Sequence, residues 1–201
     1  MSTSTSVEDP SRIYVVRVFE PAECSGLIAE AERLGAWKAA ISYKDRSQSA
    51  EVNKDIRDHT VLLENDAPRL FRPYREKIAA RFEKYLDTRR KEFYIFSIFV
   101  MNRYDVGEFF HVHVDRLPTH HSYRRYSFVC YLNDEFEDGG TAFPGIGRTY
   151  RPNAGQALLF PSHYLHSGEK VSTGRKYVLV SFLCDPRAAY LDNFYNPDSE
   201  E

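Results

Sequence analysis

Two segments in the first half of the chain place apolar residues at the spacing of an amphipathic helix. In residues 21–35 and in residues 67–92, apolar side chains recur every three or four positions. Pro21 stands where a first helical turn accepts proline, and Gly35 stands where a helix commonly ends. The pattern therefore predicts one helix in each segment.

The pattern elsewhere is typical of strands. Residues 12–19 and 56–63 are short strand-like runs, and residues 93–104 are apolar on both faces, as a central strand covered on both sides should be. Glycine or proline separates most of the shorter runs that follow. These shorter runs are 108–115, 125–132, 140–143, 155–160, 163–168 and 176–184.

The two predicted helices lie in the N-terminal half of the chain, and mostly strands follow them. This order predicts a mainly β protein with N-terminal helices, in which two helices pack on one face of a β-sandwich or jelly roll. The 201 residues suit one domain with a substantial core. We therefore expect residues 1–201 to form a single domain, with a helical support region at 11–92 and a β region at 93–184. Serine, threonine and acidic residues predict a disordered tail at 1–10.

Charge and cysteine content narrow the expected partners and location. Lysine and arginine number 27 against 29 aspartates and glutamates, a net charge of -2, which gives no reason to expect nucleic acid or an anionic membrane as a partner. No apolar run approaches the roughly 18 residues that a membrane helix needs. The 3 cysteines are far apart and odd in number, so we expect a reducing cytoplasm. The oligomeric state is left open.

The run YDVGEFFHVHVDRLP, residues 104–118, is the main candidate for chemistry. Strand alternation would put His111, His113 and Asp115 on one face. A His-x-Asp triplet alone is more often structural than a ligand pair, but His166 could supply a second imidazole downstream. Two imidazoles and one carboxylate occupy three coordination positions of a metal and leave the others open, which suits non-haem Fe(II). A closed structural zinc site would usually use cysteines, which are badly placed for it.

With these motifs in order, residues 93–184 resemble the catalytic core of the iron(II)- and 2-oxoglutarate-dependent dioxygenases, specifically the prolyl 4-hydroxylase-like branch. The resemblance covers nearly half the chain and rests on several short blocks that keep their order. These blocks are Tyr104, Gly107, Phe110, His113 and Asp115, then Tyr131-Leu132-Asn133, Gly139-Gly140-Thr141-Ala142-Phe143, GQALLF at 155–160, His166, and Gly174-Arg175-Lys176.

The resemblance implies a fold and a metal site. The implied fold is a double-stranded β-helix, a squashed, cupin-like jelly roll, at residues 93–184. The implied iron ligands, which are also the catalytic residues, are His113, Asp115 and His166. His111 is interpreted as a group near the ligands or the substrate, with a plain surface role and direct ligation as alternatives.

The resemblance also implies a cosubstrate site. Lys176 would pair with the C5 carboxylate of 2-oxoglutarate, because a cation at the bottom of an apolar barrel needs an anion to meet it. Tyr131 would donate its hydroxyl to the same carboxylate, and Tyr104 would line the pocket. Arg175 is the alternative cation if the strand register slips by one residue.

Two further regions are candidates for substrate contact. Arg57 and His59 lie where relatives often present a strand that faces the substrate. Arg116, Arg124 and Arg125 form a local positive patch just after the His-x-Asp motif, which could receive a carboxylate or phosphate. The alternative for this patch is a solvated loop.

The reaction implied by the resemblance is hydroxylation of an unactivated C–H bond with Fe(II), 2-oxoglutarate and O₂, ascorbate as an accessory reductant, and succinate and CO₂ as coproducts. Desaturation and cyclisation use the same residues and stay open. The expected substrate is a small molecule, such as an amino acid or a biosynthetic intermediate, because the compact chain shows no extra peptide-binding domain. The alternatives are a hydroxylase of prolyl or other residues in a protein, and a metal-binding jelly roll without catalysis.

Overall fold

The computed structural model of the chain describes residues 12–44, 49–82, 95–118 and 121–185. The predicted tail at 1–10 and residues 83–92 of the segment predicted to contain a helix at 67–92 lie outside the described residues. Within these residues the α-helices are α1 (Pro21–Leu34) and α2 (Pro68–Phe82). A short 3-10 turn, η2 (Glu64–Asp66), precedes α2, and another, η3 (Pro144–Ile146), lies between strands later in the chain.

The strands form two main antiparallel sheets and two small ribbons. The eight-stranded sheet contains, in spatial order, β1 (Tyr14–Arg17), β14 (Gln156–Pro161), β10 (Arg124–Tyr131), β17 (Lys176–Cys184), β8 (Val100–Tyr104), β6 (Thr60–Leu63) and β2 (Lys38–Ala39), with β7 (Ile95–Phe96) also paired to β17. The five-stranded sheet contains β13 (Arg148–Tyr150), β12 (Thr141–Phe143), β15 (His166–Gly168), β9 (Phe109–His113) and β5 (Arg57–Asp58). The ribbons are β11 (Phe136–Asp138) with β16 (Val171–Gly174), and β3 (Ser42–Lys44) with β4 (Ser49–Glu51).

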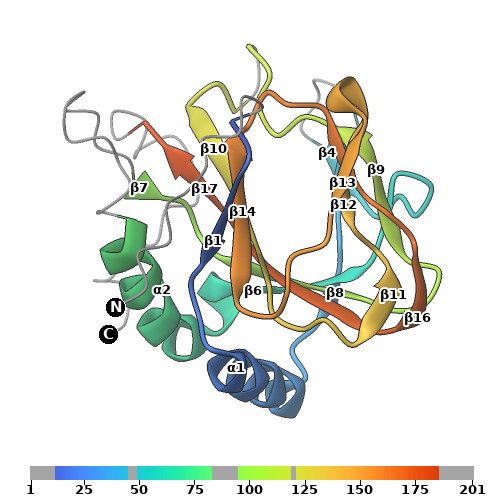
Figure 1. The fold of residues 1–201 in the computed structure, drawn as a ribbon. Helices are drawn as coiled ribbons and strands as arrows, with labels where there is room; N and C mark the ends of the chain where they lie inside the picture. The colour runs from blue at the N-terminus through green and yellow to red at the C-terminus, as the bar shows by residue number, and fades with distance from the viewer. Residues whose placement is uncertain (1–11, 45–48, 83–94, 119–120, 186–201) are drawn as a thin grey trace.

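The two main sheets face each other, and α1 and α2 lie on the side of the large sheet that is away from the small one (Figure 1). Side-chain alternation along β10 separates two cores accordingly. Phe128 and Cys130 pack in the core that contains Leu27 of α1, whereas Val129 and Tyr131 pack in the core between the sheets. Strands of the large sheet are therefore buried on both faces, which explains their nearly continuous apolar sequence.

The prediction of a mainly β chain with two helices is confirmed for the described residues, and the structure shows that the sheets are antiparallel. The region expected to be a helical support at 11–92 contributes more than helices. It supplies β1, β2 and β6 to the large sheet and β5 to the small one. Those pairings join residues far apart in the sequence, so the local pattern could not predict them. No helix among the described residues is long and apolar enough to cross a membrane.

Candidate metal centre and active site

The candidate metal ligands come from two neighbouring strands of the small sheet. His113 at the end of β9 and His166 at the start of β15 are paired directly across the two strands. Asp115 follows β9, where its backbone N–H donates to the Ser162 carbonyl at 3.0 Å. One ligand atom from each of these three side chains lies within 4.8 Å of the others, which is the only such cluster among the residues that the structure describes.

The predicted shared face of His111, His113 and Asp115 is wrong, because β9 does not alternate regularly. His113 pairs with His166, but Phe110, three residues earlier, pairs with Gly168, only two residues after His166. This register shift inserts an extra residue in β9, as in a β-bulge. As a result the ring of Phe110 stacks on His113 at 3.7 Å between centroids, while His111 is exposed.

Backbone carbonyls fix the orientation of both imidazoles. His113 Nδ1 lies 2.7 Å from the carbonyl oxygen of His111, and His166 Nδ1 lies 2.9 Å from that of Tyr164. Because a carbonyl can only accept, each Nδ1 carries the proton and each Nε2 is left free to ligate a metal. The two Nε2 atoms approach opposite oxygens of Asp115, at 3.4 Å for His113 and 3.3 Å for His166.

The Asp115 carboxylate is held in its ionised form. Burial opposes ionisation, but the imidazoles of His166 and His113 and a hydrogen bond from Ser127 outweigh it and lower the pKa of Asp115. Burial is also the largest cause of the lowered pKa of His166, which keeps that imidazole neutral. A carboxylate and neutral imidazoles are the forms that bind a divalent metal, so the donor set fits Fe(II).

Lys176 supplies a buried cation in the space between the sheets. Lys176 is 2% exposed, and its Nζ donates a hydrogen bond of 2.6 Å to the Gly139 carbonyl. The rings of Tyr104 and Tyr131 lie 4.7 and 5.2 Å from Nζ, and no carboxylate of the described residues forms an ion pair with it. An unpaired buried ammonium is costly, so this site fits an anionic ligand such as the distal carboxylate of 2-oxoglutarate.

The residues around Lys176 leave room for that ligand. A Cβ added to Gly168 would lie 3.9 Å from Lys176 Nζ and 3.6 Å from Phe110 Cβ, so a side chain there would enter this space. The Tyr131 hydroxyl lies inside the same core and is 2.7 Å from the Thr141 hydroxyl. Arg175 points elsewhere and forms an ion pair with Asp105 at the surface. The geometry therefore favours Lys176 over Arg175 as the cosubstrate cation.

The predicted substrate residues fall into different environments. His59 is only 3% exposed, and Arg57 lies beside it with its Nη2 3.1 Å from His59 Nε2. Arg125 forms an ion pair with Asp185 at 3.2 Å, so it has a partner within the chain. The roles of Arg57, His59 and His111 in substrate binding stay predictions.

Arg124 is the arginine of the predicted patch that lies against the metal centre. Its Nη1 donates to the backbone carbonyl of Asp115 at 3.4 Å, and its guanidinium carbon lies 3.8 Å from the centre of the Phe182 ring. Its Nε is buried and has no hydrogen-bond partner among the residues that the structure describes. Arg116, the residue after Asp115 in the chain, is half-buried. The described part of this segment therefore places one guanidinium, that of Arg124, next to the metal ligand.

Sequence reasoning missed two residues that support the metal ligand. The Ser127 hydroxyl donates to Asp115 Oδ2 at 2.6 Å, and the Ser162 hydroxyl lies 3.0 Å from Ser127 Oγ. Both serines are fully buried. Ser127 could have been found, because it is a small polar residue on the same strand face as Val129 and Tyr131.

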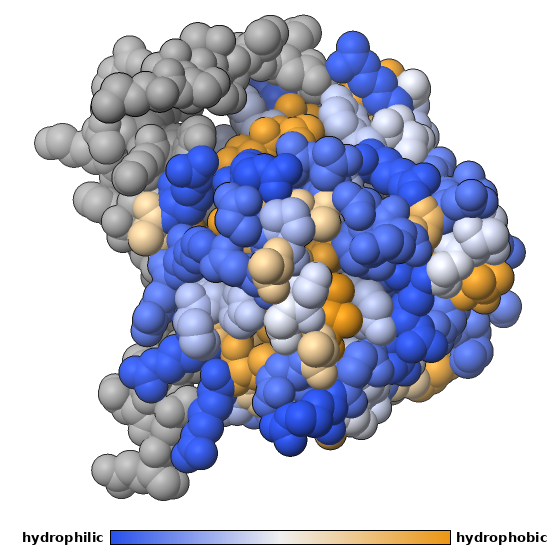
Figure 2. Space-filling view, turned by 60° about the horizontal axis from the view of Figure 1, so that its bottom comes forward, coloured by the Kyte–Doolittle hydropathy of each residue, from blue (hydrophilic) through white to orange (hydrophobic). Residues whose placement is uncertain are grey.

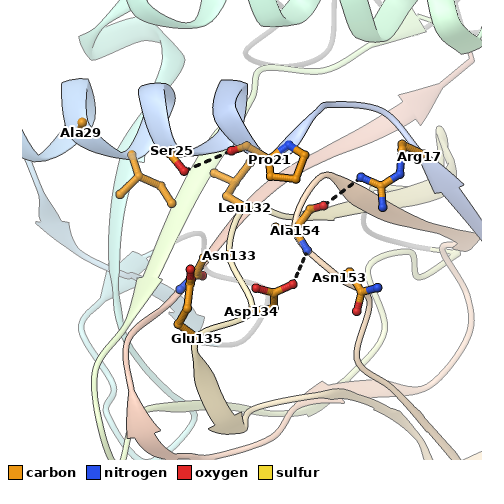
Figure 3. A pocket seen from close by; sticks show the side chains of 11 residues that line it. Arg17, Pro21, Ser25, Ala29, Leu132, Asn133, Asp134, Glu135, Asn153 and Ala154 are labelled. Atoms are coloured by element: carbon orange, nitrogen blue, oxygen red, sulfur yellow. Dashed lines mark hydrogen bonds between the residues drawn. The ribbon is translucent and has the colours of Figure 1, made fainter.

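A groove on the α1 side of the molecule lies away from this site. It has a volume of about 650 Å³ and runs between α1 and the loops before β11 and β14, lined by residues that include Arg17, Ser25, Asn133 and Ala154 (Figure 3). None of its lining residues belongs to the metal or cosubstrate sites. Figure 2 turns the bottom of Figure 1, where α1 lies, toward the viewer, and small apolar patches are scattered there among mostly polar side chains.

Known proteins share both the sequence blocks and the fold. Residues 99–184 match the model of the 2OG-Fe(II) oxygenase superfamily. A PKHD-type hydroxylase of Synechococcus sp. (strain CC9605) is 33% identical over 89 residues, which are 42% of this chain and 40% of that protein. The chain thus spans about 40% of the length of this curated relative.

Two solved structures share the fold over most of the chain. A Pseudomonas putida prolyl-4-hydroxylase superposes with a TM-score of 0.68 and 17% identity, covering 87% of this chain and 93% of that one. A Trichoplax adhaerens prolyl hydroxylase, solved with a hypoxia inducible factor peptide fragment, gives a TM-score of 0.71 and 14% identity, covering 92% and 89%. Residues 99–184, which contain the His-Asp-His cluster, are therefore similar in sequence to the 2OG-Fe(II) oxygenase superfamily, and the described fold is similar to that of these prolyl hydroxylases.

Proposed function

We propose that the protein is an Fe(II)- and 2-oxoglutarate-dependent hydroxylase built on a double-stranded β-helix. The observation that carries the proposal is the convergence of two sites between the facing sheets. His113, Asp115 and His166 offer a metal one carboxylate and two imidazoles whose Nδ1 atoms face backbone carbonyls. Lys176 offers a nearby buried cation without a carboxylate partner among the described residues. A metal-binding protein without catalysis would need only the first of these sites.

Each residue has a distinct task in this proposal. His113, Asp115 and His166 would hold Fe(II) through three positions and leave the others open. Lys176 would bind the C5 carboxylate of 2-oxoglutarate, with the Tyr131 hydroxyl as a second donor and Tyr104 as a wall. The bound iron would supply the coupling of 2-oxoglutarate and O₂ to hydroxylation, with succinate and CO₂ as coproducts.

A residue of a peptide or protein, with proline as the first candidate, is the substrate that the relatives favour. The superposed structures are named as prolyl hydroxylases, and one of them was solved with a peptide. We carry this substrate class over as part of the proposal. It replaces a free small molecule as the leading candidate.

A small anionic molecule is the second candidate, and the position of Arg124 is compatible with it. Arg124 lies against the backbone of the metal ligand Asp115, where its guanidinium could receive a carboxylate or phosphate. An acidic residue in a peptide would satisfy the same guanidinium. The substrate assay must therefore include both classes. The cytoplasmic location and the single-domain organisation stay predictions.

The proposal is tested by coupled product analysis. The Fe(II)-loaded protein is incubated with 2-oxoglutarate and ascorbate in air, with a panel of proline-containing peptides and a panel of amino acids and other small metabolites. We expect stoichiometric succinate and a product heavier than its substrate by one oxygen atom. Asp115→Ala is the matched inactive variant. Absence of succinate from the iron-loaded wild type with every substrate and in the uncoupled reaction would contradict the proposal.

A further inference from the structure

Arg57 lies on the opposite side of the Phe110 ring from the metal ligand His113. Its guanidinium carbon is 4.3 Å from the centre of that ring, and the His113 imidazole stacks on the ring at 3.7 Å with an interplanar angle of 18°. Two groups this close to one ring can only occupy its two faces. The strands enforce the arrangement, because Arg57 of β5 pairs directly with Phe110 of β9.

His59 fixes the guanidinium in that position. Arginine has only donors, so the contact of 3.1 Å between Arg57 Nη2 and His59 Nε2 requires His59 to accept through Nε2. His59 is therefore neutral, with its proton on Nδ1. Burial, followed by the charge of Arg57, lowers the pKa of His59 to about 2, which keeps it neutral at working pH. A second anchor is the Ile41 carbonyl, which accepts from Arg57 Nη1 at 3.1 Å.

The other neighbour of His59 is a wall of the cosubstrate pocket. The His59 ring stacks on Tyr104 with centroids 4.4 Å apart, and Lys176 Nζ lies 4.7 Å from the centroid of the same tyrosine ring. Arg57 therefore contacts an aromatic ring at the metal centre, and His59 contacts an aromatic ring at the cosubstrate pocket. Phe110 borders the metal centre, and Tyr104 borders the buried lysine.

We propose that Arg57 and His59 are positioning residues that hold the Phe110 ring against His113 and the Tyr104 ring beside Lys176. This inference rests on the proposed function and gives the two residues a role other than substrate contact. Both would act through a neighbouring ring. Groups that orient a metal ligand commonly change metal affinity by 10- to 100-fold when they are lost.

Cobalt(II) binding tests the inference without a substrate. Co(II) is titrated into wild type, Arg57→Met, Phe110→Leu and the double variant, with its visible absorption spectrum reporting the ligand geometry. Arg57→Met is expected to weaken Co(II) binding about tenfold or more and to change the spectrum. If Arg57 acts through Phe110, the loss in the double variant equals the loss in Phe110→Leu alone. Arg57→Lys keeps a cation at the ring and should restore most of the affinity.

Arg151→Met is the matched control, because it removes a guanidinium that lies 4.7 Å from the Phe136 ring, away from the metal cluster. It should bind Co(II) as wild type does. Wild-type affinity and spectrum in Arg57→Met, or additive losses in the double variant, would overturn the inference. A wild type that binds no Co(II) would instead overturn the proposed function.

If circular dichroism shows that Arg57→Met is unfolded, His59→Leu takes its place. This variant removes both the acceptor for Arg57 and the ring on Tyr104. It is expected to weaken Co(II) binding and, in the Co(II)-loaded protein, 2-oxoglutarate binding as well. Wild-type values for both ligands would overturn the inference.

Discussion

The Ser127 hydroxyl donates a hydrogen bond of 2.6 Å to Oδ2 of Asp115, the carboxylate that lies between the two candidate histidine ligands. Ser127 is on the large sheet, whereas Asp115 follows a strand of the small one. The bond therefore ties the metal centre to the facing sheet. It also uses one lone pair of the oxygen that His166 approaches, which limits how the carboxylate can turn.

Ser127→Ala should weaken metal binding. A hydrogen bond to a charged group contributes about 1.5–3 kcal/mol, which corresponds to a loss of roughly tenfold or more in metal affinity. The measurement is a Co(II) titration followed by visible absorption. Ser181→Ala is the matched control, because Ser181 is equally buried on the large sheet but bonds to Ser97. Equal Co(II) affinity in both variants would show that Ser127 does not position Asp115.

Lys176→Ala should impair the use of 2-oxoglutarate far more than the use of the prime substrate. Leaving one partner of a buried charge pair alone costs about 3–5 kcal/mol, or two to three orders of magnitude in affinity. The KM for each substrate is measured in turn. Arg175→Ala is the control, since Arg175 pairs with Asp105 at the surface. An unchanged KM for 2-oxoglutarate in Lys176→Ala would assign its carboxylate to another cation.

The binding of 2-oxoglutarate should take up a proton at pH 8. Burial lowers the pKa of Lys176 to about 7, so the amine is mostly neutral at pH 8 before the ligand arrives. A bound carboxylate favours the charged form and raises that pKa again, so affinity should fall as the pH rises above 7. Calorimetry in two buffers with different ionisation enthalpies measures the proton uptake.

Lys176→Arg is the control for this pH dependence. Arginine stays protonated at this pH, so the variant should bind 2-oxoglutarate with no uptake at this position. Equal observed enthalpies for wild type in both buffers would mean that Lys176 is already charged in the free protein.

Arg124→Ala should weaken binding of the prime substrate at least tenfold without changing 2-oxoglutarate binding. A charge-assisted pair with an anionic substrate group contributes roughly 1.5–3 kcal/mol. Arg125→Ala provides the comparison, because Arg125 already pairs with Asp185 and should have a smaller effect. The KM for a substrate found in the product screen is the measurement, and Co(II) affinity shows whether Asp115 is undisturbed. Wild-type KM values in both variants would show that neither arginine binds the prime substrate.

The fold class and the ligand cluster could be predicted from the sequence because local signals carry them. Helical spacing predicted α1 at its observed position, and the ordered blocks placed His113, Asp115 and His166 in one site. The resemblance indicated Lys176 as the inward cation and left Arg175 as the alternative, and the structure buries Lys176 and pairs Arg175 with Asp105 at the surface.

Features that depend on pairing between distant strands could not be predicted. The register shift in β9 exists only in its pairing with β15, and it replaces His111 with Phe110 beside His113. The Arg125 ion pair joins residues 60 positions apart. A local cluster of arginines therefore predicted a free positive patch where the structure pairs one member with Asp185.

The central claim is that one site binds Fe(II) through His113, Asp115 and His166 and then 2-oxoglutarate through the metal and Lys176. Anaerobic calorimetry of 2-oxoglutarate binding to the Fe(II)-loaded and the metal-free protein tests it most directly. For the wild type we predict one tight site whose binding of 2-oxoglutarate depends on the metal. His113→Ala, Asp115→Ala and His166→Ala should each remain folded and lose this site. His111→Ala should retain it. Equally tight binding without metal, or iron lost in His111→Ala and kept in His113→Ala, would contradict the account.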